Sequence, residues 1–403
     1  MVDHRELGRE LELFCSDPLS GAGLPIWLPN GAAARHAVEE YVREEERRAG
    51  YQHVYSPPLG KRRMYELSGH LPHFADDMFP PMRVSGDDEL VLRPAMCPHH
   101  ALAFRSRGRS YRELPLRIAE LGGMYRAERS GVLGGLNRVR AIWLNDAHNF
   151  CALSQVGAEV AAALDMIGRV HAALGVKPAG FRLSLRGDSA KYVGSPADWS
   201  HAESLLREAL AARSYIDAPG EAAFYGPKID VQVVDPAGRE STLSTVQIDF
   251  HQPARFDLSY VDCDGSRQRP VMVHRSLVGS MERLFAYLIE AHAGAFPVWY
   301  APVQAAVLPV GPEQADAASA LVANAVERGL RAQVRADGSL GARVRDAARA
   351  RIPYAFVVGA REAAEGSVAL RLRDGRALAP MPVAAALDLV VGVAAARSPE
   401  LLL

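Results

Sequence analysis

The stretch that decides the fold comprises residues 114–151, LPLRIAELGGMYRAERSGVLGGLNRVRAIWLNDAHNFC. Residues 114–127 and 139–151 have the composition of strands, and residues 129–138 between them are rich in glycine. Two strands that follow one another and are separated by turn residues favour an antiparallel pair. We therefore predict a hairpin-like pair with a long connecting loop.

The segments on either side of this pair predict a unit in which strands and helices are mixed. Strands are expected at 51–58, 88–93, 225–235, 241–250 and 255–262, and helices at 31–49, 154–175, 196–214 and 276–294. Many antiparallel-type strands with helices between them are typical of the α+β class. We predict an α+β domain with an antiparallel sheet over residues 1–295.

The pattern changes at residues 296–303, FPVWYAPV, which we interpret as a domain junction. Beyond it, strands at 304–310, 331–336, 354–359 and 367–373 alternate with helices at 312–330, 340–351 and 382–396. Regular alternation of this kind predicts a compact α/β domain. We place this second domain at residues 300–403.

Composition limits the classes of function. The net charge is −1 and the pI is near 6.9, so contact with nucleic acid must come from local patches. The charged N-terminus does not resemble a signal peptide, and no stretch has the 18 apolar residues of a membrane span. The four cysteines are scattered singly, which indicates a reducing compartment. We expect a cytoplasmic protein without a membrane partner.

Three groups of residues suggest chemistry, and each also has a structural interpretation. Arginines near glycine-rich turns (Arg126, Arg138, Arg140 and Arg283) indicate an anion site, because a half-buried guanidinium needs an anion, although salt bridges also satisfy it. Cys97, His148 and His274 match no zinc-finger spacing, so only the fold can make them ligands. Tyr225, Lys228 and Asp230 alternate with apolar residues, as at a partly solvated sheet edge.

Several of these stretches resemble one known family. AMCPHH (95–100), the stretch 109–131, NRVRAIWLNDAHNFC (137–151), EAAFYGPKIDV (221–231), TVQIDF (245–250), VMVHRSLVGSMERLF (271–285) and FPVWYAPVQ (296–304) are similar, in the same order, to the threonyl-tRNA synthetases. These are class II aminoacyl-tRNA synthetases. The resemblance implies a catalytic domain of the class II synthetase fold followed by an anticodon-binding domain.

The resemblance implies a zinc site. In this family one cysteine and two histidines hold Zn²⁺ in the amino-acid pocket, and the matching residues are Cys97, His148 and His274. The family uses the open metal positions for the amino group and hydroxyl of threonine, which valine cannot imitate. Because the chain begins where the family's catalytic core begins, we expect a short form without the N-terminal editing region. Serine should then be mischarged at a measurable level.

The resemblance also assigns the other site residues. The expected ATP-binding residues are Arg126, Glu128, Arg138, Gln247 and Arg283. The expected amino-acid-binding residues are Asp146, Tyr225, Leu144, Thr242 and Ser280. Arg126, Arg283 and Lys228 are expected to be catalytic, with Mg²⁺ accompanying ATP, and Pro57 matches a proline at the family's dimer interface, which implies a homodimer. In the second domain Glu362 and Arg371 match anticodon-reading positions, so tRNA(Thr) is the expected partner.

The sequence departs from the family pattern around the expected pocket. Leu144 replaces a glutamine, Thr242–Leu243–Ser244 replace Gln-Cys-Gly, and His99 replaces the glycine of CPGH. The segment ADGSLGARVRD (336–346) is also about three residues shorter than its counterpart in the family. These departures leave open a specialised paralogue, which is either an inhibitor-resistant duplicate or an activator of a threonine-like amino acid for biosynthesis. A non-catalytic binding or regulatory protein is a further alternative, but the retained Arg126 and Arg283 argue against it.

Overall fold

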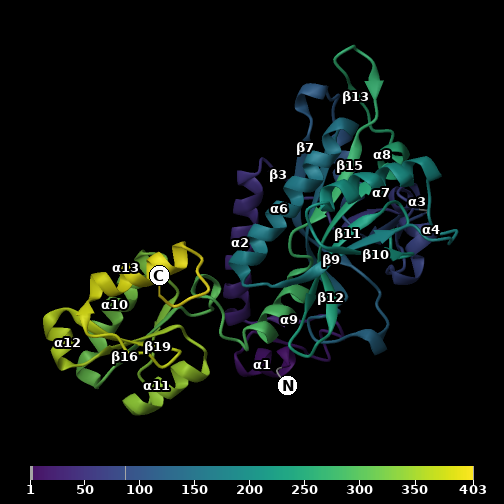
Figure 1. The fold of residues 1–403 in the computed structure, drawn as a ribbon. Helices are drawn as coiled ribbons and strands as arrows, with labels where there is room; N and C mark the ends of the chain where they lie inside the picture. The colour runs from purple at the N-terminus through teal and green to yellow at the C-terminus, as the bar shows by residue number, and fades with distance from the viewer. Residues whose placement is uncertain (1–2, 87, 403) are drawn as a thin grey trace.

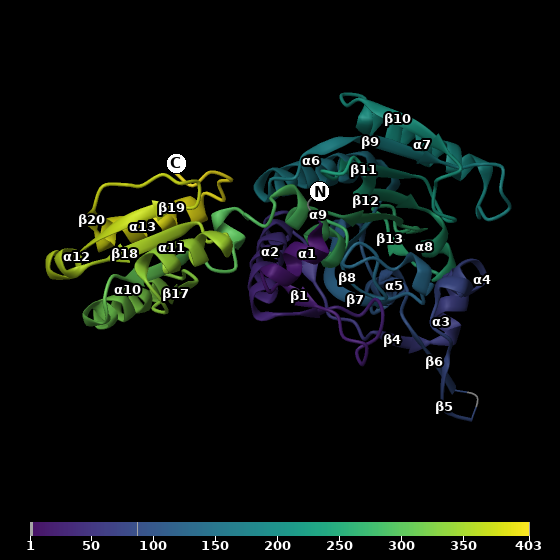
Figure 2. The ribbon, with the colours of Figure 1, turned by 90° about the horizontal axis from the view of Figure 1, so that it is seen from below.

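The computed structural model describes residues 3–86 and 88–402, and these form two units that each surround a hydrophobic core. Figures 1 and 2 show the units side by side, joined through the short helix η5 (Val298–Tyr300). The architecture predicted from sequence, an α+β unit followed by an α/β unit, is confirmed. The division at residues 295 and 300 stays a prediction.

The larger unit is built on an eight-stranded sheet with the order β10-β9-β11-β12-β15-β8-β7-β3. Its strands are β3 (Gln52–His53), β7 (Leu116–Tyr125), β8 (Ala141–Cys151), β9 (Pro178–Leu185), β10 (Tyr215–Pro219), β11 (Lys228–Val234), β12 (Glu240–Asp249) and β15 (Val271–Ser276). Only the outermost pairs, β10 with β9 and β3 with β7, are parallel. The sheet is therefore predominantly antiparallel, as expected.

The pair β7–β8 is the hairpin-like pair expected from residues 114–151, and its register runs from Leu116 opposite Phe150 to Tyr125 opposite Ala141. Side chains alternate between the two faces of a strand. On β8, Ala147 and Cys151 belong to the main apolar core, whereas Asp146 and His148 point to the opposite face. One face of the sheet is thus hydrophobic and the other can carry a polar site.

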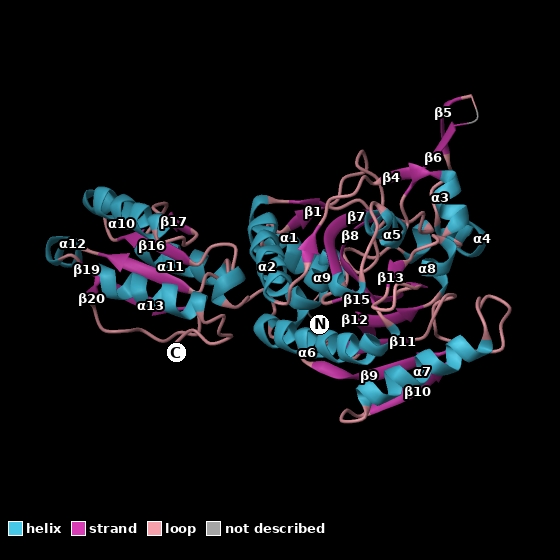
Figure 3. Cartoon of the chain, turned by 90° about the horizontal axis from the view of Figure 1, so that it is seen from above, coloured by secondary structure: helices cyan, strands magenta, loops and turns pink. Residues whose placement is uncertain are grey.

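Helices from four parts of the chain cover the hydrophobic face. They are α2 (Pro29–Arg48), α6 (Val156–Leu174), α7 (Pro196–Leu210) and α9 (Met281–Ala291), and all contribute to one core. Figure 3 shows these helices around the strands, with α1 (His4–Glu10) beside α9. On the polar face, α5 (Cys97–Arg105) and α8 (His251–Arg255) pack on β8 and β15 over a smaller core.

Smaller elements complete this unit. They are α3 (Arg62–Leu67), α4 (His70–Phe74), the sheet of β4 (Leu59–Lys61), β6 (Asp88–Leu92) and β5 (Met82–Ser85), and the pairs β1 (Phe14–Cys15) with β2 (Ile26–Trp27) and β13 (Tyr260–Val261) with β14 (Arg267–Gln268). The strand expected at 255–262 is mostly wrong, because only Tyr260 and Val261 pair. Arg255 ends α8, and Asp257, with φ +50°, turns the chain so that Phe256 and Leu258 are buried.

The second unit is a five-stranded sheet with the order β17-β16-β18-β19-β20. Its strands are β16 (Ala305–Pro309), β17 (Ala332–Val334), β18 (Tyr354–Val358), β19 (Ser367–Leu372) and β20 (Met381–Pro382), and its helices are α10 (Ala315–Glu327), α11 (Leu340–Arg349), α12 (Ala360–Glu365) and α13 (Val383–Ala395). Parallel pairing of β16 with β17 and β18 follows from the helices that connect them. None of the described helices in either unit combines the length and apolarity needed to cross a membrane.

Candidate active site

A lateral row of residues crosses the polar face of the larger sheet. Lys228 on β11 stands opposite Gln247 on β12, Gln247 opposite His274 on β15, and His274 opposite His148 on β8. Residues in register on neighbouring antiparallel strands bring their side chains within contact distance. Segments more than a hundred residues apart in the sequence therefore meet at one place on the sheet.

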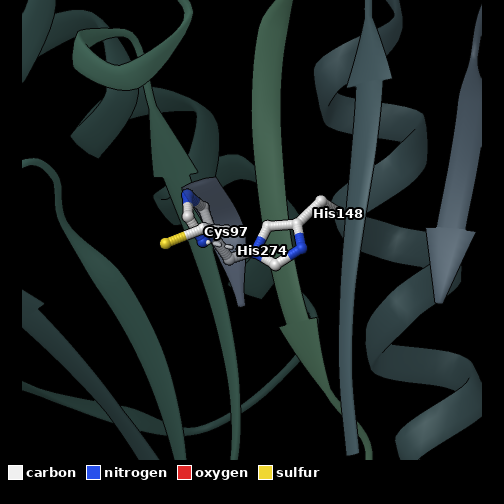
Figure 4. A group of neighbouring side chains, drawn as sticks. All are labelled: Cys97, His148 and His274. Carbon is white, nitrogen blue, oxygen red and sulfur yellow. Dashed lines mark hydrogen bonds between the residues drawn. The ribbon is translucent and has the colours of Figure 1, made fainter. Parts of the chain in front are cut away.

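Cys97, His148 and His274 come together at the centre of this row. One potential ligand atom from each lies within 4.8 Å of the other two, and all three residues are buried (Figure 4). His148 Nε2 is 3.0 Å from His274 Nδ1. Cys97 begins helix α5, which holds the thiol over the strands. The structure thus assembles the sulfur and the two imidazoles that the sequence left far apart.

The remaining ring nitrogens of the two histidines are held by other side chains. His148 Nδ1 is 2.7 Å from His100 Nδ1, and His100 Nε2 is 3.2 Å from Glu120. His274 Nε2 is 2.9 Å from Asp249 Oδ2. Metal-bound histidines in proteins characteristically have their second nitrogen oriented in this way. The pattern fits a metal site, because one nitrogen of each ring is left to face the shared space.

Burial determines the protonation of these groups. It lowers the pKa of His148 well below its ordinary value and raises the pKa of the Cys97 thiol well above its own. Gln252 Nε2 lies 3.2 Å from Cys97 Sγ and donates to it. Neutral imidazoles and a sulfur ligand are the donors that Zn²⁺ prefers, and three protein ligands leave coordination positions for a substrate. The donor set therefore fits zinc.

A cavity of about 300 Å³ opens beside the three ligands. Its lining includes the expected residues Cys97, Arg126, Glu128, Arg138, Leu144, Asp146, Tyr225, Thr242, Gln247, His274, Ser280 and Arg283. Near the metal-type cluster, Tyr225 stacks on His274 with ring centroids 5.1 Å apart and donates to Gln247 at 3.1 Å. Burial raises the pKa of Asp146, whose Oδ2 is 3.8 Å from His148 Nε2. This end of the cavity can bind a small polar group.

Three arginines that lie near one another also line the cavity, and the part that they line is called the arginine end. Arg138 pairs with Glu128 at 2.8 Å, and Arg283 Nε donates to the carbonyl of Asn137 at 3.4 Å. Among the described residues, Arg126 Nε is buried without a hydrogen-bond partner, and burial lowers the pKa of this guanidinium. Glu128 neutralises only part of this charge. Guanidinium groups gathered at a cavity in this way can bind a multiply charged anion such as a polyphosphate.

Three of the expected site residues lie elsewhere. Lys228 is not in the cavity lining, and its ammonium pairs with Asp230, which also accepts from Ser184 at 2.7 Å. Glu362 and Arg371 belong to the second unit. Glu362 accepts from the Gly359 N–H at 3.1 Å at the start of α12, and Arg371 is exposed on β19.

The residues that depart from the family pattern fall into two groups. Leu144, Thr242 and Leu243 line the cavity. Ser244 lies behind the wall, where its hydroxyl accepts from His171 Nε2 at 2.7 Å and donates to the Leu277 carbonyl at 2.6 Å. His99 points away from the cavity towards the β4–β6 region, where its buried Nδ1 has no partner among the described residues.

Several residues at the site were not predicted from the sequence. Asp249 continues the alternation of Thr245 and Gln247 on β12, and His100 lies one helical turn after Cys97, so both could have been found from periodicity. His70, whose Nε2 is 3.9 Å from Cys97 Sγ, has no such signal. It reaches the site from α4, a short helix whose position depends on the tertiary structure.

The chain is similar to known families over most of its length. Residues 82–292 match the family described as tRNA synthetase class II core domain (G, H, P, S and T). Residues 304–392 match the family described as anticodon binding domain. The first match spans the cavity and the three metal-type ligands, and the second lies within the smaller unit.

Individual relatives are named as threonine–tRNA ligases or threonyl-tRNA synthetases. The chain is 48% identical over 375 residues to threonine–tRNA ligase from Geobacillus kaustophilus, covering 92% of this chain and 57% of that protein. It is 47% identical over 393 residues to threonine–tRNA ligase from Thermus thermophilus, covering 96% of this chain and 60% of the relative. The crystal structure titled as the RNA binding domain of threonyl-tRNA synthetase from Cryptosporidium parvum superposes with a TM-score of 0.92 at 32% identity, over 99% of both chains.

Proposed function

This chain belongs to the threonyl-tRNA synthetase family of class II aminoacyl-tRNA synthetases, and we propose that it activates threonine with ATP and transfers it to tRNA(Thr). The chain spans 57% of the length of the Geobacillus relative, so the activity is argued from the site itself. The observation that carries the proposal is one cavity lined both by residues of the metal-type cluster and by three arginines that lie near one another. That arrangement suits an amino acid and ATP bound end to end.

The arginine end is proposed to bind ATP. Arg126, Arg138 and Arg283 would contact the phosphates, and Glu128 and Gln247 would complete the nucleotide site, with Mg²⁺ accompanying the triphosphate. The unpartnered Arg126 Nε supports this assignment, because a buried guanidinium N–H without a partner costs free energy until an anion is bound.

The other end is proposed to select the amino acid. Cys97, His148 and His274 would hold one Zn²⁺, which supplies a Lewis acid for the amino group and the hydroxyl of threonine. Asp146 would accept the hydroxyl hydrogen bond, and Tyr225, Leu144, Thr242 and Ser280 would form the wall. A site that pairs with a hydroxyl rejects an isosteric side chain without one far more strongly than an apolar pocket can.

The reaction then requires mainly positioning and charge stabilisation. The threonine carboxylate attacks the α-phosphate of ATP, the bond to pyrophosphate breaks, and the arginines stabilise the charge that develops on the phosphoryl oxygens. Lys228 is proposed to contact the adenylate from the strand next to Gln247. The acyl group then passes to the terminal ribose of the tRNA.

The second unit is proposed to recognise the tRNA. Glu362 and Arg371 would read the anticodon, and the exposed arginines of α11 would contact the phosphate backbone. The motif that contains Pro57 is proposed to form a homodimer interface. Next to it, Tyr55 is 88% exposed, which supports a partner surface, because large aromatic side chains are enriched at protein interfaces.

ATP–pyrophosphate exchange with a panel of amino acids tests the proposal, and aminoacylation of tRNA(Thr) tests the second step. Threonine is expected to give the strongest exchange. The Arg283→Ala variant separates an enzyme from a non-catalytic binding protein. An enzyme should lose about 10²–10³-fold in exchange when one charge-stabilising donor is removed, whereas a regulator would keep its function.

A specialised paralogue is a second candidate, favoured by the replacements Leu144, Thr242 and Leu243 in the cavity wall. Such a protein would either resist an inhibitor that contacts this wall or activate a threonine-like amino acid. The retained zinc-type ligands and Asp146 indicate that its substrate still carries a hydroxyl or an equivalent ligand. Strongest exchange with an amino acid lacking both a hydroxyl and an amine side chain would exclude this candidate as well.

A further inference from the structure

His4, at the beginning of α1, is buried at 4% exposure between helix α9 and the glycine-rich loop that precedes β8. Its Nδ1 lies 2.7 Å from Glu290 Oε1, and its backbone N–H donates to the same oxygen at 3.2 Å. On the other side of the ring, the backbone N–H of Leu136 donates to Nε2 at 3.1 Å. The imidazole thus bridges a helix and a loop that are far apart in the sequence.

These contacts determine which nitrogen carries the proton. An amide N–H can only donate, so His4 Nε2 must be the acceptor, and Nδ1 must carry the hydrogen that it donates to Glu290. The second oxygen of Glu290 accepts from Arg239 at 3.3 Å, and Asp3 pairs with Arg5 at 2.5 Å. Asp3, His4 and Glu290 are close enough to suggest a cation site, but His4 Nε2 accepts from Leu136 and His4 Nδ1 carries a hydrogen, so the imidazole has no free lone pair for a metal. The group is therefore a hydrogen-bonded connection.

The glycine-rich loop at residues 129–138, which His4 contacts, also carries residues that line the cavity near the arginines. Its carbonyl at Asn137 accepts from Arg283, and the next residue, Arg138, pairs with Glu128. Leu136 is fully buried and holds the loop on the protein. A displacement of Leu136 would consequently move the backbone that supports two of the arginines lining the cavity.

Gly135 shows how closely the loop approaches the imidazole. A Cβ at this position would lie 2.3 Å from His4 Nε2, and the φ angle of +53° already favours glycine. The loop can be this close only because residue 135 has no side chain. This contact is independent of the hydrogen bonds and places the same atom, His4 Nε2, against the loop.

Helix α9 supplies the opposite support. Glu290 is in its last turn, and Arg283 is in its first turn. One rigid helix therefore holds Arg283 directly and, through Glu290 and His4, also holds the loop that carries Arg138. We propose that His4 is a positioning residue for ATP, keeping the Arg138 loop in register with Arg283. This inference rests on the proposed function, since it assumes that the two arginines bind one triphosphate.

Two substitutions of His4 by an amide residue test the roles of its two ring nitrogens one at a time. Glutamine at position 4 places a carbonyl oxygen near the position of Nε2 and can still accept from Leu136. Asparagine is shorter and can replace only the Nδ1 bond to Glu290. Loss of the bond from the Leu136 N–H should raise the KM for ATP about tenfold in His4→Asn. His4→Gln loses only the Nδ1 bond, and residue 4 still donates to Glu290 through its backbone N–H. His4→Gln should stay within about threefold of the wild type, and the KM for threonine should change little in either variant.

Hydrogen–deuterium exchange supplies a readout that does not depend on activity. Amides of residues 134–138 should exchange faster in His4→Asn than in His4→Gln, without nucleotide present. The same substitutions at His36, whose side chain is 68% exposed on α2, serve as matched controls and should change neither quantity.

Equal effects of the two substitutions on the KM for ATP and on loop exchange would overturn the inference, as would a fall in kcat with no change in the KM for ATP. If the wild type catalyses no ATP–pyrophosphate exchange with any amino acid, the proposed function fails. In that case, faster exchange of the loop in His4→Asn alone still supports the connection, and equal exchange still refutes it.

Discussion

At the scale of single residues, the site depends on which of its buried nitrogen atoms have hydrogen-bond partners. His148 and His274 each have one nitrogen held by a neighbour and one that faces Cys97. When His148 Nδ1 donates to His100 and His274 Nε2 donates to Asp249, the two nitrogens that face each other at 3.0 Å both carry lone pairs, which a cation satisfies.

Replacing Cys97 with serine should abolish the metal site. The wild type is expected to purify with about one zinc per chain and the variant with close to none, because three ligands are the minimum of a catalytic zinc site. Elemental analysis of both proteins after dialysis measures this. Cys151→Ser, at a buried thiol outside the site, is the control and should retain zinc. Equal metal content in the wild type and Cys97→Ser would contradict the assignment.

His171 should make the stability of the protein depend on pH. Burial lowers the pKa of this residue to about 4, whereas the ordinary value is 6.5. Between these values the unfolded state binds a proton that the folded state does not, so stability is complete above pH 6.5 and falls as the pH drops towards 4. The contribution lost by pH 4.5 is about 2–3 kcal/mol.

The His171→Gln variant tests this dependence, since its amide can still donate to Ser244. Urea unfolding at pH 7 and pH 4.5 should show a smaller loss of the free energy of unfolding in the variant. An equal loss in both proteins would show that His171 is protonated in the folded state.

At the scale of elements, the prediction from sequence succeeded where periodicity is strong. The pair β7–β8 and the alternation of strands and helices after residue 304 were predicted because their patterns are local. The strand expected at 255–262 is reduced to the two residues of β13, and helix α4 was not predicted, because tertiary contacts determine both. The residues of the site divide in the same way, into those that the sequence identified and those that only tertiary contacts bring to the site. The family resemblance supplied the residues of the strands, but it did not supply His70 or the partners His100 and Asp249.

Strand β12 carries a buried hydroxyl group, that of Ser244. Ser244 is buried and makes two hydrogen bonds, with His171 and with Leu277. Ser244→Gly should reduce the free energy of unfolding by about 1–3 kcal/mol, because buried partners lose their bonds. Ser241, exposed on the same strand, is the matched control. If Ser241→Gly destabilises the protein as much as Ser244→Gly does, the effect comes from glycine in a strand and not from the lost hydrogen bonds.

At the scale of the whole molecule, the two units divide the proposed work. The larger unit holds the cavity, and the smaller one presents exposed arginines on α11. The side chain of Arg349 is 81% exposed, whereas Arg343 donates to the Pro309 carbonyl and is occupied within the unit. Arg349 is therefore the better candidate for contact with tRNA phosphates.

The affinity for tRNA should fall steeply with salt, and Arg349→Gln should reduce the slope of log K against log salt by about one. Fluorescence titrations of labelled tRNA at several salt concentrations measure both quantities. Arg63→Gln, at an arginine 83% exposed on the larger unit, controls for net charge. A slope that Arg349→Gln leaves unchanged would place the tRNA on another surface.

We propose that the Cys97–His148–His274 cluster selects a hydroxyl-bearing amino acid for reaction with ATP in the adjoining cavity. The most direct test compares threonine with valine in ATP–pyrophosphate exchange by the zinc-loaded protein. If the cluster selects the hydroxyl, kcat/KM for threonine should exceed that for valine by about 10⁴-fold or more. Comparable exchange with the two amino acids would contradict it.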